Sequence, residues 1–271
     1  MTLESFFLIL TGGFVTGILG ALLGIGGGVF LVPYLVLFLH IPIHQAIATG
    51  IVSAIATSSA AAAVNVERRF TNIRLGMFLE VATTVGAILG GFAAIALSSS
   101  TLSKMFGILL FVVAFLMTRK IRVGEDAAST AEQKGWIGGT YFDPATRGEV
   151  QYTVQRLPLG LTISLIAGNI SGMLGIGGGV IKVPAMTLFC AVPMKAATAT
   201  SNFMIGVTAV ASAFIYYAHN QIHPVITSAA VIGVLFGSMV GTVVSAKIRG
   251  RTIAMIFTIV LLVLALQMIL R

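Results

Sequence analysis

The chain of 271 residues is 57% hydrophobic and only 9% charged, against roughly 25% charged residues in an ordinary soluble domain. This composition excludes a soluble protein, because so few charged side chains could not cover its surface. The net charge of +8 does not indicate nucleic acid, since the basic residues stand in short segments between apolar runs, where they set membrane orientation. The single cysteine, Cys190, excludes an internal disulfide.

Apolar runs follow one another along nearly the whole chain, and a helix needs about 20 such residues to cross a bilayer. Membrane barrels alternate apolar and polar residues, which these runs do not, so we expect an all-α polytopic membrane protein. The first residues, through Ser5, have no basic cluster or cleavage site, so the first run should remain in the mature protein. In chain order the runs lie at about 5–23, 28–40, 43–64, 75–97 and 102–119, and then at about 157–174, 179–192, 194–217, 224–246 and 252–270.

An internal repeat divides these runs into two units of five. Gly24–Val29 reappears letter for letter as Gly175–Val180, and the offset from 24 to 175 is 151 residues. The same offset pairs Pro33 with Pro184 without a gap, which indicates a duplicated gene. We assign 1–120 to a first membrane repeat, 121–156 to a polar cytoplasmic linker and 157–271 to a second membrane repeat.

Basic residues predict how the two repeats are oriented. They form three clusters. The first follows the third run of the first repeat and comprises Arg68, Arg69 and Arg74. The second lies in the central connection (Arg119, Lys120, Arg122, Lys134, Arg147 and Arg156), and the third lies between the fourth and fifth runs of the second repeat (Lys247, Arg249 and Arg251). Placing all three clusters in the cytoplasm requires five crossings per repeat, hence two inverted-topology five-segment repeats. We therefore expect about ten segments in the cell inner (plasma) membrane, with a cytoplasmic linker and both termini outside.

The second run of each repeat leaves this count open. It is short and contains a proline, so hydropathy alone would give four spans per repeat. The short runs could also be half-helices that meet their neighbours inside the membrane. The linker contains turn dipeptides such as Asp143-Pro144 and reads as a connector that holds at most a short hairpin, or as a regulatory or docking segment.

The glycine runs at the junctions between first and second segments are the first candidate site. They are Gly26, Gly27 and Gly28, and Gly177, Gly178 and Gly179. A new helix begins beyond each run, and its first N–H groups and positive dipole end suit an anion. Two inverted copies would aim two such ends at one point near the bilayer midplane. The alternative is a tight interhelical turn without a ligand.

Polar residues within the apolar runs extend this candidate site, because polar groups in a membrane tend to mark the substrate pathway. The set predicted to bind substrate comprises Thr49, Asn169, Thr200, Ser201 and Asn202, of which Thr49 and Thr200 are repeat equivalents. Hydroxyls and amides suit the oxygens of a sulfonate or sulfite. Hydroxyls at 53–59 continue a polar face, although Ser and Thr also bond their own helix.

Two charged residues lie within apolar runs. Lys182 follows the second glycine run by three residues, and the helix dipole disfavours a lysine there unless an anion lies near. We expect Lys182 to take part in anion binding; snorkelling or pairing with a carboxylate are the alternatives. Glu80 would either pair with a nearby arginine or carry a coupling proton.

The remaining patterns predict packing rather than chemistry. Gly86 and Gly90, like Gly237 and Gly241, have the small-x-x-x-small spacing that lets helix backbones approach closely. The sequence contains no spacing typical of metal ligands, no P-loop and no nucleophile elbow. We therefore expect no cofactor, no metal and no enzymatic activity.

Leu23–Pro33 and Leu174–Pro184 share the pattern LGIGGGVxxVP, and with Ala199–Asn202 and Tyr141–Gly160 they resemble the sulfite exporter TauE/SafE family. The resemblance covers essentially the whole chain. It implies a secondary transporter of sulfite, thiosulfate, sulfoacetate or other organosulfonates, with efflux in many members. The repeats differ at Gly50 against Ser201 and at Leu31 against Lys182, so the second repeat should hold the charged end of the substrate.

The expected mechanism is alternating access, in which two inverted repeats rock around a central site. A passive anion channel and a non-transporting membrane subunit of a larger complex are the alternatives. The expected partners are a small sulfur-containing anion and membrane lipid, with no nucleic acid. The sequence does not decide whether the protein forms a homodimer.

Overall fold

The computed structural model describes residues 3–23, 27–122, 137–143, 148–245 and 250–270. Gly26 of the predicted site, together with Lys134, Arg147, Lys247 and Arg249 of the basic clusters, lies outside these residues. The helices are α1 (Leu3–Leu23), α2 (Gly28–Leu37), α3 (Ile43–Glu67), α4 (Ile73–Ala96), α5 (Ser99–Arg122), α6 (Leu157–Leu174), α7 (Gly179–Leu188), α8 (Met194–Ala218), α9 (Pro224–Ser245) and α10 (Gly250–Leu270). The strands are β1 (Gly138–Asp143) and β2 (Gly148–Thr153).

The helices follow the predicted apolar runs closely, because each run ends at the glycines, prolines and polar residues that also end the helix. Within the described residues, six helices are long and apolar enough to cross a membrane by length and composition. They are α1, α3, α4, α6, α8 and α9. The helices α2 and α7 have 10 residues each, about 15 Å of rise, which is half of a hydrocarbon core. The chain is therefore a polytopic helical membrane protein.

The same structure recurs in both halves of the chain at the offset of the sequence repeat. Helices α7 and α8 begin and end 151 residues after α2 and α3. Left-handed backbone also recurs at equivalent non-glycine positions, His40 with Ala191 and Arg69 with Asn220. Shared helix bounds and shared turn conformations show that the duplicated sequence specifies the same local structure twice.

Glycines hold helices of different repeats together. Helix α1 packs along α9, and α6 packs along α4. A Cβ added at Gly90 would collide with the Asn169 carbonyl of α6, and one at the equivalent Gly241 would lie 2.7 Å from the Ile18 carbonyl of α1. The prediction that these glycines serve helix packing is confirmed, since only a missing side chain allows such backbone contact.

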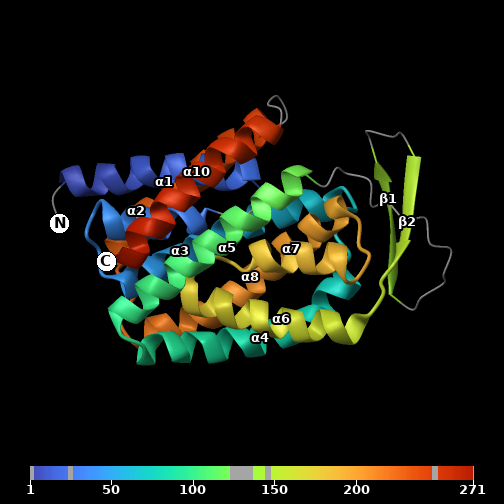
Figure 1. Ribbon diagram of the computed structural model, residues 1–271, viewed down its shortest axis with the longest axis horizontal. Helices are drawn as coiled ribbons and strands as arrows, with labels where there is room; N and C mark the ends of the chain where they lie inside the picture. Colours follow the sequence, from blue (N-terminus) through green and yellow to red (C-terminus); the bar gives the residue numbers. More distant parts are fainter. Residues whose placement is uncertain (1–2, 24–26, 123–136, 144–147, 246–249, 271) are drawn as a thin grey trace.

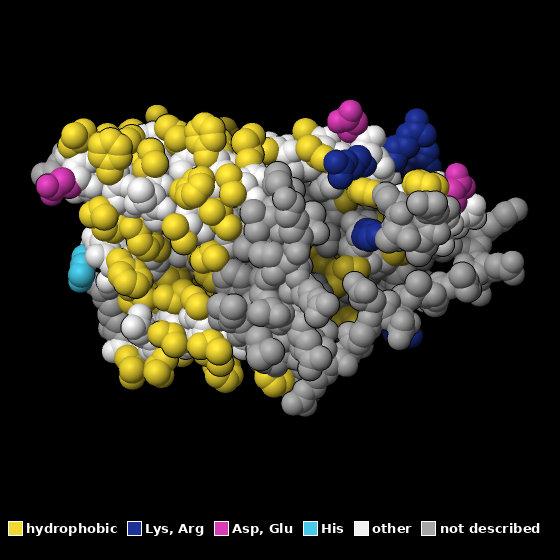
Figure 2. Space-filling view, turned by 90° about the horizontal axis from the view of Figure 1, so that it is seen from above, with side chains coloured by type: hydrophobic (Ala, Val, Ile, Leu, Met, Phe, Trp, Pro, Cys, Tyr) yellow, Lys and Arg dark blue, Asp and Glu magenta, His cyan; other side chains and the backbone are white. Residues whose placement is uncertain are grey.

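Helix α4 shows why these helices suit lipid rather than water. Its buried face carries small and polar residues, among them Gly86, Gly90 and Glu80. Its exposed face carries large apolar side chains, namely Met77, Phe78, Val81, Val85, Ile88, Leu89 and Phe92. This distribution reverses that of a soluble helix. Figure 2 shows apolar side chains over much of the visible face and the Lys and Arg side chains toward one end.

That basic end also carries the β hairpin. Strands β1 and β2 pair antiparallel, with Gly138 opposite Thr153 and Tyr141 opposite Val150. The hairpin lies at one end of the helices, and the start of α1 and the end of α10 lie at the other (Figure 1). The linker was expected to hold at most a short hairpin, and the structure contains one. Its β1 and β2 are the two strands among the residues that the structure describes.

Candidate functional site

The second glycine turn has a backbone that only glycine adopts readily. Gly175, Gly177 and Gly178 have φ values of 71°, 74° and 69°, in the left-handed region that Cβ disfavours. In the first repeat Gly27, equivalent to Gly178, has a φ of −67°. The two turns are therefore not identical, although their glycines are.

The two glycine turns meet at the interface between the repeats. A Cβ at Gly28 would lie 2.6 Å from the carbonyl oxygen of Gly175 and 3.6 Å from that of Gly50. A Cβ at Gly50 would in turn lie 3.0 Å from the Gly175 carbonyl oxygen. The glycines of one repeat thus pack against the backbone of the other, as expected for two turns that face each other.

The N-terminus of α7 presents free donors. Its N-cap residue, Gly178, has no side chain to cap the helix, and the Gly178 carbonyl accepts the N–H groups of Ile181 and Lys182. The N–H groups of Gly179 and Val180 have no hydrogen-bond partner among the residues that the structure describes. Unpaired N–H groups at the positive end of a helix dipole are a typical setting for a bound anion.

Two hydroxyl residues flank this N-terminus. Ser201 of α8 is 1% exposed, and its Oγ lies 3.3 Å from the position of a Cβ on Gly179. Within the described part of the chain this Oγ has no hydrogen-bond partner, although a buried hydroxyl normally has one. The Oγ of Ser171, on α6, lies 3.3 Å from a Cβ position on Gly178. We call the N–H groups of 179–180 and these two hydroxyls the α7 N-terminal site.

This site belongs to the second repeat alone. The first-repeat equivalents of Ser171 and Ser201 are Gly20 and Gly50, which have no hydroxyl. Ser171 was not identified by the sequence analysis. The signal that could have found it is its place four residues before Gly175, one helical turn back along the same face.

Thr49 and Thr200 are buried but lie at two different interfaces. The Oγ1 of Thr49 is 3.3 Å from the Oγ1 of Thr227 on α9. The Oγ1 of Thr200 accepts the N–H of Asn72, just before α4, at 3.0 Å. These two predicted site residues are therefore engaged in helix contacts at equivalent places in the two repeats.

The other polar candidates are half-buried or lie along α3. Asn169 and Asn202 are half-buried, and the Asn169 backbone lies against Gly90. Along α3, Thr57 and Ser58 donate to carbonyls of their own helix, to Ser53 and Ile55. The Ser53 Oγ is buried and has no partner among the described residues.

Lys182 and Glu80 form a buried ion pair. Lys182 Nζ lies 3.9 Å from Glu80 Oε2, and the two side chains are 1% and 6% exposed. Lys182 donates to Thr208 Oγ1 at 2.9 Å, and Thr208 donates to Glu80 Oε1 at 2.6 Å. Glu80 thus pairs with Lys182, not with an arginine as predicted. For Lys182, pairing with a carboxylate is the alternative that the structure realises.

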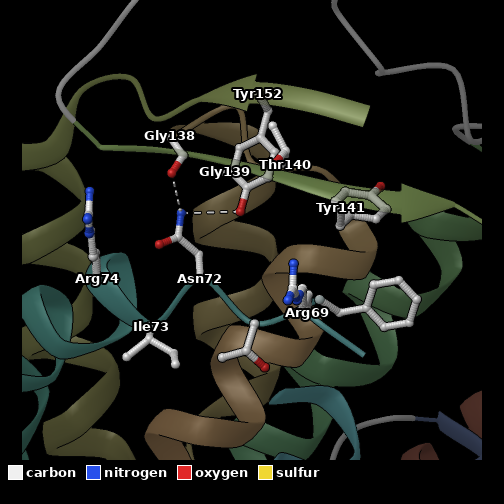
Figure 3. A pocket seen from close by; sticks show the side chains of 11 residues that line it. Arg69, Asn72, Ile73, Arg74, Gly138, Gly139, Thr140, Tyr141 and Tyr152 are labelled. Carbon is white, nitrogen blue, oxygen red and sulfur yellow. Dashed lines mark hydrogen bonds between the residues drawn. The ribbon is translucent and has the colours of Figure 1, made fainter. Parts of the chain in front are cut away.

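Asn72 is a further residue that sequence reasoning missed, and it connects the hairpin to the helices. Its side chain accepts the N–H of Leu75, which caps α4, and donates to the Gly138 carbonyl at 3.4 Å and to Tyr152 Oη at 3.2 Å. Figure 3 shows Asn72 between the hairpin above and α4 below, with Arg69 and Arg74 on either side. These residues line a cavity of about 240 Å³.

Replacing Asn72 by alanine should loosen the hairpin. The change removes an N-cap that contributes about 1 kcal/mol to stability. It also removes two hydrogen bonds to the hairpin, each of which contributes about 1 kcal/mol. We expect faster hydrogen exchange of the amides of 138–143 and 148–153, measured by mass spectrometry in detergent. Tyr152→Phe removes only one of these bonds and should give a smaller increase. Unchanged exchange in Asn72→Ala would show that other contacts hold the hairpin.

The chain is 28% identical to the probable membrane transporter protein YunE of Bacillus subtilis, over 98% of this chain and 97% of the relative. It is 25% identical to the probable membrane transporter protein MJ0441 of Methanocaldococcus jannaschii, over 95% of this chain and 93% of the relative. No solved structure matches significantly. The family model for the sulfite exporter TauE/SafE matches residues 9–268. With its apolar helices and its duplicated glycine turns, the chain is a membrane transporter that belongs to the sulfite exporter TauE/SafE family.

Proposed function

We propose that the protein is a secondary transporter of small sulfur-containing anions such as sulfite or organosulfonates, and that it exports them. The observation that supports this best is the α7 N-terminal site, where backbone N–H groups lie beside the buried hydroxyl of Ser201, none of them with a partner in the part of the chain that the structure describes. The anion passes through without chemical conversion, and ATP is not hydrolysed by this chain.

The donors of this site match the chemistry of the proposed substrate. A sulfite or sulfonate group has three oxygens that accept hydrogen bonds, and N–H and hydroxyl groups donate to them without requiring a fixed charge. Such a set resembles an anion site at a helix N-terminus inside a membrane transporter. Ser201 is 1% exposed, so exchange of the anion with either side requires a conformational change, as alternating access supplies.

The proposed topology has ten segments in two inverted repeats, with both termini outside the cell inner membrane. Three features support it: the hairpin and the termini lie at opposite ends (Figure 1), basic residues gather at the hairpin end (Figure 2), and positive charge favours the cytoplasm. This count includes α2 and α7 as crossings, because each repeat without them would have four, an even number that leaves the hairpin and the termini on the same side.

Binding of an anion panel to the purified protein tests this function. We expect saturable binding of sulfite, thiosulfate or sulfoacetate in preference to taurine and acetate, measured by calorimetry. Ser201→Ala should raise the Kd about tenfold, because it removes a hydrogen bond to a charged group. Ser228→Ala, a change on the exposed face of α9, is the matched control and should leave the Kd unchanged.

Two outcomes would contradict the proposal. Equal binding of acetate and the sulfur anions would remove the substrate class. In proteoliposomes a carrier shows faster efflux of labelled anion when unlabelled anion is added on the far side, so a lack of such stimulation would favour a passive channel.

A further inference from the structure

Glu80 has a set of contacts that a plain structural carboxylate does not need. Besides Lys182, its carboxylate accepts hydrogen bonds from Thr208 of α8 at 2.6 Å and from Thr83 and Thr84 of its own helix at 3.0 and 3.1 Å. The group lies in the third turn of α4, about 10 Å from the helix start at the hairpin end. A charged pair inside a membrane is costly and generally marks a functional site.

The other ionisable residues near Glu80 leave Lys182 as its charged partner. Helices α6, α7 and α8 surround this part of the molecule. Helix α6 contains no ionisable side chain, α7 contains Lys182, and α8 contains Lys195, Tyr216 and Tyr217. Tyr216 donates to the carbonyls of the α6 C-terminus. Lys195, two residues into α8, is more than three helical turns from Thr208.

The fold itself does not require this ion pair. The repeat equivalents of Glu80 and Lys182 are Val231 and Leu31, and Leu31 is fully buried. The two positions that correspond to the ion pair, one in each repeat, therefore hold apolar side chains. Replacing a buried ion pair by apolar residues is often neutral or stabilising. A pair that is present at one of the two equivalent places therefore points to a role in transport.

Lys182 connects the ion pair to the α7 N-terminal site. Its Cε lies 3.3 Å from the position of a Cβ on Gly178, the N-cap residue that precedes the site. Its Nζ continues to Thr208 and Glu80. An anion at the α7 N-terminus and the Glu80 carboxylate would thus compete for electrostatic attraction to the single positive charge of Lys182. When Glu80 takes up a proton, that charge becomes available to the anion.

We propose that Glu80 is a proton-binding site and that the anion and a proton are carried together, one proton per anion. This inference rests on the proposed function and names its coupling ion. Proton uptake by Glu80 strengthens anion binding, and by thermodynamic reciprocity anion binding strengthens proton uptake by the same factor. The predicted coupling is symport, so an imposed pH gradient drives the anion toward the alkaline side. Export from a cell whose interior is the more alkaline side is then driven by a higher concentration of the anion inside.

The test uses the full chain in proteoliposomes, with thiosulfate and sulfoacetate as probes. Both keep a constant charge between about pH 6 and 8, so their own protonation does not contribute. Two assays run in parallel with the membrane potential clamped at zero: accumulation driven by a pH gradient, and exchange of labelled for unlabelled anion at equal pH. One proton per anion allows accumulation of up to about tenfold per unit of pH gradient.

We expect the wild type to accumulate the probe toward the alkaline side and Glu80→Gln to lose this accumulation, with an exchange rate that no longer depends on pH. Glu67→Gln changes an exposed carboxylate at the end of α3 and should behave as the wild type. Accumulation by Glu80→Gln equal to the wild type would overturn the assignment of the proton to Glu80. Wild-type exchange without any drive from the pH gradient would overturn proton coupling while leaving the carrier intact. Absence of both binding and exchange would overturn the proposed function itself.

A second measurement needs no variant. Adding thiosulfate or sulfoacetate to the purified wild type in weakly buffered detergent should remove up to about one proton per bound anion from solution, because of the linkage above. Anion binding without proton uptake would overturn the proposal even where Glu80→Gln does not fold.

Discussion

Gly90→Ala is expected to lower the free energy of unfolding in detergent by about 3 kcal/mol, the upper part of the range for overpacking. The added methyl would collide with the Asn169 carbonyl of α6, and backbone, unlike a side chain, cannot rotate away. The two helices would have to separate along their whole contact. Thermal unfolding followed by circular dichroism measures the effect, and a midpoint equal to that of the wild type would contradict the close packing of α4 and α6.

Gly206→Ala is the matched control for this change. A Cβ at Gly206 of α8 would lie 3.2 Å from the Oγ of Ser58, the movable end of a side chain. Because alanine favours a helix by about 1 kcal/mol over glycine, the control should be as stable as the wild type or slightly more stable. A loss equal to that of Gly90→Ala would mean that any glycine replacement disturbs the bundle.

Lys182→Met should be the most damaging change in the second repeat. It leaves the Glu80 carboxylate buried without a counter-charge, and removing one partner of a buried pair costs about 3–5 kcal/mol. We expect a lower unfolding midpoint and little folded protein at neutral pH. The loss should be smaller at acid pH, because protonation of Glu80 removes the unpaired charge.

The double variant Glu80→Leu/Lys182→Met separates pairing from other roles of the lysine. It replaces both charges by apolar groups, as at the equivalent positions Val231 and Leu31, so stability should return to within about 1 kcal/mol of the wild type. Transport driven by a pH gradient should remain lost. If the double variant is as unstable as Lys182→Met, the lysine stabilises the fold through contacts other than Glu80.

The sequence was sufficient to predict the helices and the repeat, because apolar runs and glycine spacing are local patterns. Gly86 and Gly90 were assigned to helix packing on spacing alone, and the structure supplies their partners on α6. Turn residues in the linker allowed at most a short hairpin, and the structure has strands at 138–143 and 148–153.

The contacts between repeats could not be predicted in this way. Glu80 and Lys182 are 102 residues apart in sequence, and no local pattern indicates that α4 of one repeat lies beside α7 of the other. Thr49 and Thr200 were predicted to be pathway residues because they are polar and equivalent. Their hydroxyls lie within hydrogen-bond distance of neighbouring segments at separate interfaces, and their role in substrate binding stays a prediction. A hydroxyl that faces a partner helix and one that faces a substrate have the same appearance in a sequence.

The packing of helices of one repeat against helices of the other has a consequence for the biosynthesis of the protein. The glycine faces of α1 and α4 contact α9 and α6, which leave the ribosome only after the first repeat is complete. Until then these faces present backbone and the buried carboxylate of Glu80 without their partners. We expect the first repeat alone to be degraded or retained by membrane chaperones. Two halves expressed together as separate chains should protect each other, since each supplies the surfaces that the other lacks.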